Sequence, residues 1–329
     1  MRLPELGDGV AFGVGGTNYR IGHCDIEGNI DKVVIKPTPK TTDEFFSRTA
    51  LDLLRAADRG SEWGVMGVPG PVKVRTFPDG HVDQNFRVTQ IPALSRQEGF
   101  DPRTELIKGD RAVEELFRMK DFNFLVVNDG DLAAQAAAHF FGKPNEDNEQ
   151  FDVIADLING TGTGGALVRR DDRFPGANLF HPDPGLWEVG HRPISPAFPS
   201  RTIEKTISGP AVEKHIGKPT SEISAKDPIY KEVARGMGSV VLDFALNGGA
   251  DLVVVSGGFA VHTEPFYSKE LKNYLDDFAN SHNPMSDKLP AVTFVQPEQC
   301  DEYELYGARG AMLSFLTRRA IDKIVAESN

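Results

Sequence analysis

Two glycine-rich segments, one in each half of the chain, constrain the fold more than any other feature of the sequence. The first runs from Gly13 to Thr17 and the second from Gly160 to Gly165. Each lies between short apolar, β-branched runs, a pattern that predicts a β-hairpin with a glycine turn. Because glycine lets backbone N–H groups approach an anion closely, both turns are candidate phosphate-binding loops. A hairpin turn that binds nothing is an equally ordinary structure, and neither segment has P-loop or dinucleotide-fingerprint spacing.

The rest of the chain alternates short apolar runs with longer segments of helical spacing, which is typical of an α/β fold. At 329 residues the chain exceeds the usual single-domain size, so we expect two domains. We place the first at residues 1–127 plus about 311–329 and the second at 128–310. The segment Tyr303 to Ile324 is predicted to be a final long helix that packs on the first domain. Strands are predicted at 10–12, 19–24, 32–35, 63–68, 122–127, 153–158, 166–169 and 252–256, and further helices at 45–57, 110–119, 132–141 and 230–246.

Charge and cysteine content narrow the classes of partner. The formal net charge of −12 disfavours a nucleic-acid partner, because a polyanion would be repelled. The two cysteines, Cys24 and Cys300, are far apart and suggest neither a disulfide framework nor a cysteine-based zinc site, which fits a reducing cytoplasm. The start of the chain is acidic, and no run of about 18 apolar residues occurs, so we expect no membrane segment.

A carboxylate at the end of a predicted strand is the leading catalytic candidate. The strand 122–127 runs directly into Asn128 and Asp129, and α/β folds bind ligands at the carboxyl ends of their strands. The alternative is that Asp129 only caps the following helix, predicted from Leu132 onward. Asp131 is better placed for capping, which favours a catalytic role for Asp129.

Seven motifs, taken in chain order, resemble those of the ROK sugar kinases, which belong to the hexokinase and actin-like ATPase superfamily. They are Gly13 to Arg20, Gly67 to Val72, Asn128-Asp129, Gly160 to Gly165, Glu188-Val189-Gly190-His191, Ser208-Gly209-Pro210 and Ser256-Gly257-Gly258. The resemblance covers nearly the whole chain, as far as Gly307 to Ala311. It implies a two-domain actin-like ATPase (ribonuclease H-like) α/β fold with a cleft between the domains.

The resemblance also assigns roles to individual residues. Asp129 matches the general base that takes a proton from the sugar hydroxyl as it attacks the γ-phosphate of ATP. The residues matched to sugar binding are Asn128, Glu188, His191, Glu204 and, less closely, Asn85; those matched to ATP are Gly15, Gly16, Thr17, Gly162, Thr163, Gly257 and Gly258. Taken singly, each glutamate has a plain alternative as a solvated loop carboxylate, and His191 as a structural histidine. Together they form the donor and acceptor set that a carbohydrate pocket requires.

Two departures from the family pattern lead to specific expectations. The first loop of the family usually begins with an aspartate that helps to position the metal on ATP, whereas this chain has Gly13. We therefore expect weakened metal positioning, and Gly13→Asp is expected to raise kcat or lower the Mg²⁺ requirement. The cysteine cluster that often follows the Glu-x-Gly-His motif is also missing, so no structural zinc and no protein metal ligand is expected.

The sequence therefore predicts an ATP-dependent carbohydrate kinase of the glucokinase or hexokinase type, with ATP and Mg²⁺ as cofactors and a small sugar as substrate. The alternative is a sugar-binding regulatory protein or a catalytically impaired kinase homologue, which the glycine at position 13 motivates. An ATP hydrolase or structural actin-like protein is disfavoured by the sugar-type polar set. Neither nucleic acid nor membrane is an expected partner, and a homodimer remains open. The sugar itself is not specified.

Overall fold

The computed structural model describes residues 3–57, 60–69, 72–76, 82–88, 102–118, 122–144, 150–174, 177–183, 189–193, 201–281 and 289–328. The chain divides into two compact units. The first comprises Met1–His139, Leu179–His181 and Glu304–Asn329, and the second Phe140–Asn178 and Pro182–Tyr303. Each contains a mixed sheet and its own core of buried apolar residues, so the predicted two-domain α/β fold is confirmed. Among the described helices, none is long and apolar enough to cross a membrane.

The first unit is built on a five-stranded sheet in the order β3-β2-β1-β4-β7. β1 pairs antiparallel with β2, which confirms the predicted first hairpin, and β1, β4 and β7 run parallel. β1 and β4 are buried at every position, as expected of strands covered on both faces. The strands are β1 (Gly9–Val14), β2 (Asn18–Cys24), β3 (Ile30–Pro37), β4 (Trp63–Val68) and β7 (Asn123–Asn128), with a separate hairpin of β5 (Val72–Thr76) and β6 (Val82–Val88).

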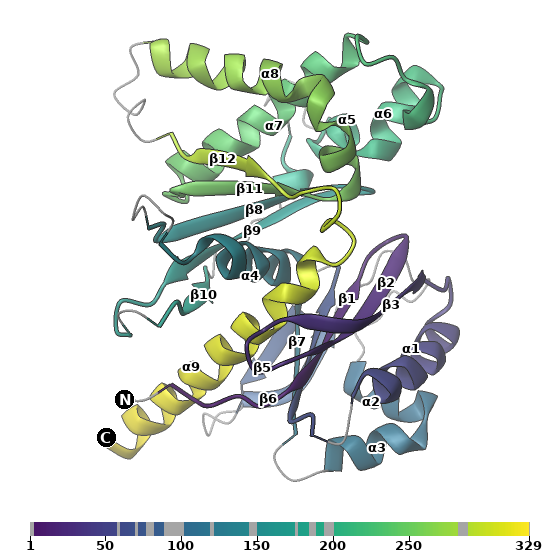
Figure 1. Ribbon diagram of the computed structural model, residues 1–329, viewed down its shortest axis with the longest axis vertical. Helices are drawn as coiled ribbons and strands as arrows, with labels where there is room; N and C mark the ends of the chain where they lie inside the picture. The colour runs from purple at the N-terminus through teal and green to yellow at the C-terminus, as the bar shows by residue number, and fades with distance from the viewer. Residues whose placement is uncertain are drawn as a thin grey trace. The chain divides into compact units, whose positions relative to one another are not determined.

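Helices cover both faces of this sheet, with α1 to α3 on one face and α9 on the other (Figure 1). The helices are α1 (Thr42–Ala56), α2 (Pro102–Gly109), α3 (Arg111–Arg118), α4 (Asp129–Phe141) and α9 (Ala308–Ser328). Ala308, Ala311 and Met312 of α9 are buried in the same core as Val10 and Trp63. The predicted return of the C-terminal helix to the first unit is therefore confirmed, although residues 303–307 form a 3-10 turn before α9 begins.

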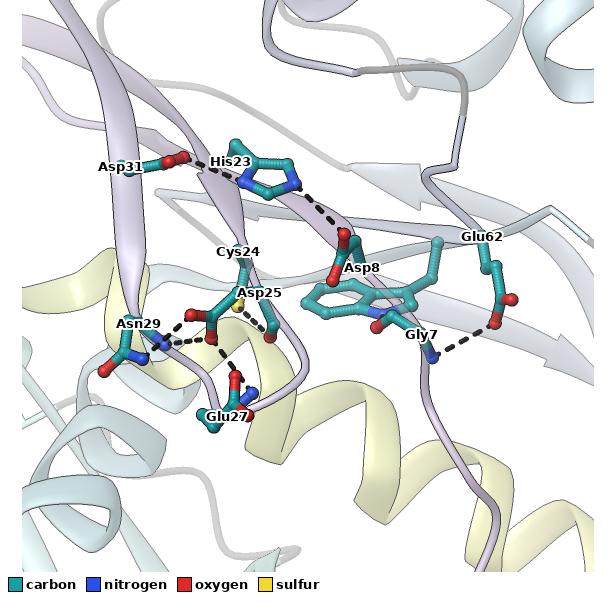
Figure 2. A network of polar contacts seen from close by, with 10 residues as sticks. Gly7, Asp8, His23, Cys24, Asp25, Glu27, Asn29, Asp31 and Glu62 are labelled. Carbon is teal, nitrogen blue, oxygen red and sulfur yellow. Dashed lines mark hydrogen bonds and ion pairs between the residues drawn. The ribbon is translucent and has the colours of Figure 1, made fainter.

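A polar network ties the start of β1 to β2 and β3 (Figure 2). His23 Nδ1 lies 2.8 Å from Asp31 Oδ1, its register partner on β3, and His23 Nε2 lies 3.7 Å from Asp8 Oδ2. In the turn after β2, Asp25 Oδ1 accepts a hydrogen bond from the backbone N–H of Asn29 at 2.8 Å. These contacts hold the end of the hairpin that is opposite the glycine turn.

The second unit contains a sheet in the order β10-β9-β8-β11-β12. β8 pairs antiparallel with β9, as predicted for the second hairpin, and runs parallel to β11, which is parallel to β12. Helices α5, α7 and α8 lie on one face of the sheet (Figure 1). The strands are β8 (Val153–Asn159), β9 (Thr163–Arg170), β10 (Phe180–Pro182), β11 (Leu252–Ser256) and β12 (Ala291–Phe294), and the helices are α5 (Glu204–Ile207), α6 (Gly209–Ile216), α7 (Ile229–Leu246) and α8 (Gly258–Asn280).

The longest helix of the second unit, α8, was not predicted from the sequence. Its interior contains Pro265, which lacks a backbone N–H and usually ends a helix, and its outer face is polar. Burial of Phe259, Tyr267 and Leu271 in the core nevertheless stabilises the helix. Tertiary packing thus outweighs the local preference of the sequence.

A buried aspartate connects three segments of the second unit. Asp156 on β8 is fully buried, and its two oxygens accept hydrogen bonds from Ser256 Oγ at 2.6 Å and from Tyr303 Oη at 3.0 Å. Burial raises the pKa of Tyr303 well above its ordinary value, and the negative charge of Asp156 and the hydrogen bond to it raise it further. The neutral phenol is therefore the form that the folded state stabilises.

This pKa shift predicts a loss of stability in alkaline solution. The pKa is raised in the folded state only, so the contribution of Tyr303 is complete below the unfolded tyrosine pKa of about 10 and is lost as pH rises above it. Tyr303→Phe should lower the free energy of unfolding at pH 7 by about 1.5–3 kcal/mol, because Asp156 loses a donor. The variant should also lose less stability than the parent between about pH 10 and 11.

Urea unfolding at pH 7, 9, 10 and 11 measures both effects. Tyr274→Phe is the matched control, since it removes a phenol from the partly exposed face of α8 without touching Asp156. If the free energy of unfolding depended on pH equally in the parent and in Tyr303→Phe, the raised pKa of Tyr303 in the folded state would be contradicted.

Candidate active site

Strand register brings two of the predicted features of the first unit to the same edge of its sheet. Gly13 on β1 pairs with Gly67 on β4, which pairs with Val127 on β7. The turn at Gly15 to Thr17 and the pair Asn128-Asp129 follow these positions directly, so both lie at the carboxyl edge of the parallel strands. β4 lies between β1 and β7, which places these two strands ~10 Å apart at this edge.

Hydrogen bonds fix the shape of the glycine turn. The backbone N–H of Gly15 donates to the carbonyl of Asn18 at 2.9 Å, and the backbone N–H of Thr38 donates to the carbonyl of Thr17 at 2.9 Å. Thr38 Oγ1 also donates to the carbonyl of Gly15 at 2.8 Å. These bonds tie the turn to the end of β3 and leave a rigid loop whose Gly16 is exposed.

Asp129 is the first residue of α4, and Asn128 is the cap of that helix. Asn128 Oδ1 and Asp129 Oδ1 each accept the backbone N–H of Gly130 at 2.9 Å. The prediction that Asp131 caps the helix is therefore wrong, because α4 begins at Asp129 and Asp131 lies inside its first turn. Asn128, the last residue of β7, supplies the cap, and Asp129 follows it, partly exposed, at the carboxyl end of the strand.

Two glycines set the position of α4 and thus of Asp129. A Cβ at Gly67 would lie 2.6 Å from Leu132 Cδ2, so β4 packs closely under the first turn of α4, and a larger residue there would have to displace the Leu132 side chain. A Cβ at Gly307 would overlap the carbonyl oxygen of Leu132 and lie 2.8 Å from the backbone nitrogen of Ala136. Backbone cannot move aside as a flexible side chain can, so Gly307 is required by the close packing of this segment on α4.

The structure shows what surrounds Gly13. A side chain at this position would overlap the carboxylate of Glu304, which is paired with Arg20 through an Nη1–Oε1 distance of 3.1 Å. Arg20 is also the register partner of Gly13 on β2. The site of the missing aspartate is thus not open space, because a carboxylate from the C-terminal part of the chain fills it. No local signal in the sequence could have identified Glu304, since it lies 291 positions after Gly13 and meets it only through folding.

In the second unit, the glycine loop between β8 and β9 contacts the predicted sugar-binding glutamate. The backbone N–H of Thr163 donates to Glu204 Oε2 at 3.1 Å, and the same oxygen is 3.0 Å from the position of a Cβ at Gly162. Thr163 Oγ1 donates to Asn159 Oδ1 at 3.0 Å. The loop therefore presents Gly162 to solvent while the side chain of Thr163 is turned inward and buried.

The Gly257-Gly258 turn lies against the same loop. Gly257 has φ +90°, a conformation that favours glycine, and a Cβ there would lie 2.7 Å from the carbonyl carbon of Asn159. A Cβ at Gly160 would lie 3.7 Å from the backbone nitrogen of Gly258, where α8 begins. The two predicted nucleotide segments of this unit are therefore neighbours at the carboxyl edge of β8 and β11.

His191 lies on a segment that adjoins Glu204. It ends a short 3-10 turn, Val189–His191, and is exposed. The carbonyl oxygen of the following residue, Arg192, accepts a hydrogen bond from the backbone N–H of Ile203 at 2.9 Å, and the Arg192 side chain forms an ion pair with Asp243. Of the other predicted sugar residues, Glu188 lies outside the described residues, and Asn85 is placed within β6 but its side chain is not described.

The backbone N–H groups of the glycine loops suit the oxygens of a phosphate chain better than they suit a metal ion. Among the described residues, no group of three or more His, Cys, Asp or Glu is placed to hold a metal ion. Mg²⁺ is commonly held by one or two carboxylates together with substrate phosphates, so this donor set is compatible with a nucleotide-bound magnesium. Neither Cys24 nor Cys300 is part of a disulfide, and burial, followed by the charge of Asp25, raises the pKa of Cys24 to about 12.

Solved structures share this fold over nearly the whole chain. A ROK family glucokinase from Streptomyces griseus in complex with glucose and AMPPNP superposes with a TM-score of 0.67 at 19% identity, covering 93% of this chain and 99% of that chain. A ROK hexokinase from Thermus thermophilus gives a TM-score of 0.60 at 19% identity, with 95% and 99% covered. The chain has the fold of the ROK sugar kinases.

The ROK fold is also shared by a regulator. A ROK family transcriptional regulator, a homologue of the E. coli MLC protein, gives a TM-score of 0.63 at 14% identity, covering 97% of this chain and 82% of that chain. No protein-family model matches the sequence, and no curated protein matches it. The comparison thus establishes the ROK fold, and the activity has to be argued from the site residues.

The contact between Gly13 and Glu304 generates a prediction about stability, which stands beside the prediction about activity made from the sequence. Gly13→Asp should lower the free energy of unfolding by about 1–3 kcal/mol, because the new carboxylate overlaps that of Glu304 and competes with it for Arg20. The double variant Gly13→Asp, Glu304→Ala should recover most of that loss, since one carboxylate again faces Arg20.

Chemical denaturation of the parent, both single variants and the double variant measures this coupling. If Gly13→Asp instead kept the stability of the parent and raised the Mg²⁺-dependent rate, the prediction about stability would be wrong and the expectation from the sequence would hold.

Proposed function

We propose that this protein is an ATP-dependent sugar kinase of the ROK family that transfers the γ-phosphate of ATP to a sugar hydroxyl. The observation that carries the proposal is the position of Asp129, which starts α4 at the same sheet edge as the Gly15 to Thr17 turn. The fold shared with a glucokinase in complex with glucose and AMPPNP supports the same assignment. Turnover of ATP with glucose, mannose, fructose and N-acetylhexosamines tests it directly.

In this proposal Asp129 acts as the general base. It accepts the proton of the attacking sugar hydroxyl, so that the oxygen forms a bond to phosphorus as the bond to the ADP oxygen breaks. Asn128 holds the first turn of α4 through Gly130 and so fixes the direction of the carboxylate. Positioning of this kind is worth most in phosphoryl transfer, where the protein contributes orientation and charge stabilisation more than covalent chemistry.

The glycine loops take the phosphates and the nucleotide. Gly15 shapes the first turn through its bond to Asn18. The backbone N–H groups of Gly16 and Thr17 in the first unit, and of Gly162 and Thr163 in the second, are the proposed donors for anionic oxygens. The turn at Gly257-Gly258 takes the adenosine side of the nucleotide. Magnesium, when bound with the nucleotide, neutralises the phosphate charge.

The polar residues of the second unit recognise the sugar in this proposal. Glu204 and His191 lie on adjoining segments beside the glycine loop and accept or donate hydrogen bonds to sugar hydroxyls. Glu188 and Asn85 complete the set by resemblance to the ROK kinases. The alternative function is a sugar-binding regulator without efficient transfer, which the similarity to a ROK regulator favours. Sugar binding without turnover of any sugar in the panel would select that alternative.

Replacing the proposed base should slow transfer strongly without unfolding the protein. Asp129→Asn should lower kcat by roughly 10²- to 10⁴-fold, because the amide cannot accept the hydroxyl proton, while sugar binding is partly retained. Asp131→Asn is the matched control, since it makes the same charge change in the same turn of α4. Steady-state rates and sugar titrations separate the two variants. Activity of Asp129→Asn within a few-fold of the parent would remove Asp129 from the mechanism.

Removal of metal should affect activity and not folding. Chelation with EDTA should abolish sugar phosphorylation, and excess Mg²⁺ should restore it, because the metal enters with the nucleotide phosphates. The melting temperature should not change, since no structural zinc is expected to tie folding to metal. A stoichiometric zinc in the purified protein, lost together with thermal stability on chelation, would show that the loop after His191 had been misread.

A further inference from the structure

The carboxylate of Glu204 occupies a backbone donor in the loop that is assigned to phosphate. Glu204 Oε2 accepts the N–H of Thr163 at 3.1 Å and covers the face of Gly162, where a Cβ would be 3.0 Å away. A carboxylate oxygen on a backbone N–H is chemically equivalent to a phosphate oxygen on the same donor. The structure therefore shows that this N–H can hold an anion, and that the anion it holds is an internal one.

Backbone contacts hold the loop around this contact, whereas Glu204 reaches it through its side chain. The backbone N–H of Gly160 donates to the carbonyl of Gly162 at 2.9 Å, and the N–H of Gly209 donates to the carbonyl of Gly160 at 3.0 Å. Gly190 packs so closely on the carbonyl of Thr163 that a Cβ there would overlap it. Glu204 is partly exposed, so its side chain can rotate away without any change in the loop.

We infer that Glu204 gates the phosphate loop: its carboxylate blocks the N–H of Thr163 until a sugar hydroxyl draws it away. The inference rests on the proposed kinase function and adds an order of binding to it. A phosphate oxygen and the carboxylate cannot share one donor, and their like charges repel each other in a partly buried site. Nucleotide must therefore displace Glu204, at the cost of a charge-assisted hydrogen bond.

A sugar changes this balance because its hydroxyl groups are alternative donors for Glu204. Once a hydroxyl hydrogen-bonds to the carboxylate, the N–H of Thr163 is released to the nucleotide. Sugar then raises the affinity for nucleotide, and by linkage nucleotide raises the affinity for sugar by the same factor. The device keeps nucleotide from being held in a productive position when only water is available as acceptor.

The test is the affinity for AMPPNP with Mg²⁺ in the absence of sugar, measured by titration calorimetry. Glu204→Gln keeps the size of the side chain but removes its charge, and Glu204→Ala removes the acceptor altogether. Glu213→Gln is the matched control, because Glu213 Oε1 likewise accepts a backbone N–H, that of Thr220 at 2.8 Å, and lies outside the proposed site. All three variants change the net charge by the same amount.

Glu204→Gln should bind AMPPNP about fivefold more tightly than the parent without sugar, which is the difference between a charge-assisted and a neutral hydrogen bond. Glu204→Ala should bind at least as tightly as Glu204→Gln, because no side-chain acceptor then competes for the N–H of Thr163. Glu213→Gln should bind as the parent does. Equal or weaker affinity in both Glu204 variants would overturn the gate, and so would an equal gain in Glu213→Gln. If no sugar is turned over by the parent, the kinase proposal fails, while the affinity comparison still decides the gate. Absence of AMPPNP binding to every protein would overturn both.

Discussion

The close packing of β4 and of the turn before α9 against the first turns of α4 is the constraint on which the candidate site of the first unit depends. β4 passes beside Leu132 at Gly67, and the turn before α9 meets the backbone of Leu132 and Ala136 at Gly307. At Gly307 the neighbouring backbone leaves no space for a Cβ, and at Gly67 a Cβ would have to displace the Leu132 side chain. Since α4 carries Asp129 as its first residue, two glycines distant from each other in sequence determine where the proposed base lies.

Acidic side chains from distant segments meet the glycine loops of both units. Glu304 lies against Gly13 at the end of β1 and is paired with Arg20, whereas Glu204 lies against Gly162 and accepts the N–H of Thr163. A glycine loop that offers donors to an anion also attracts any carboxylate that folding brings near it. In the first unit the carboxylate is neutralised by an arginine, and in the second it is held by the loop itself.

Sequence patterns predicted much of this structure where a local rule was sufficient. The two hairpins, the strand that ends at Asn128 and the return of the C-terminal helix follow from periodicity and from glycine in turns. The capping prediction failed because Asn128, on the strand side, supplies the acceptor and extends α4 back to Asp129. Helix α8 was missed because a proline and a polar face weaken its local signal, while burial of Phe259 and Tyr267 supplies the compensating energy.

In the candidate site, too, local sequence features predicted some residues, whereas tertiary packing decided which residues contact each other. Residue type and order along the chain were sufficient to select Asp129 and the two glycine loops as candidates, since glycine turns and strand-end carboxylates are local features of a sequence, whereas Glu204 was selected by its resemblance to the ROK pattern. Local sequence patterns could not predict which residues these candidates contact. That Gly13 faces Glu304, and that Glu204 binds the N–H of Thr163, depends on contacts between segments 291 and 41 positions apart. Such contacts exist only after the chain has packed, because their energy comes from groups that are not neighbours in the unfolded chain.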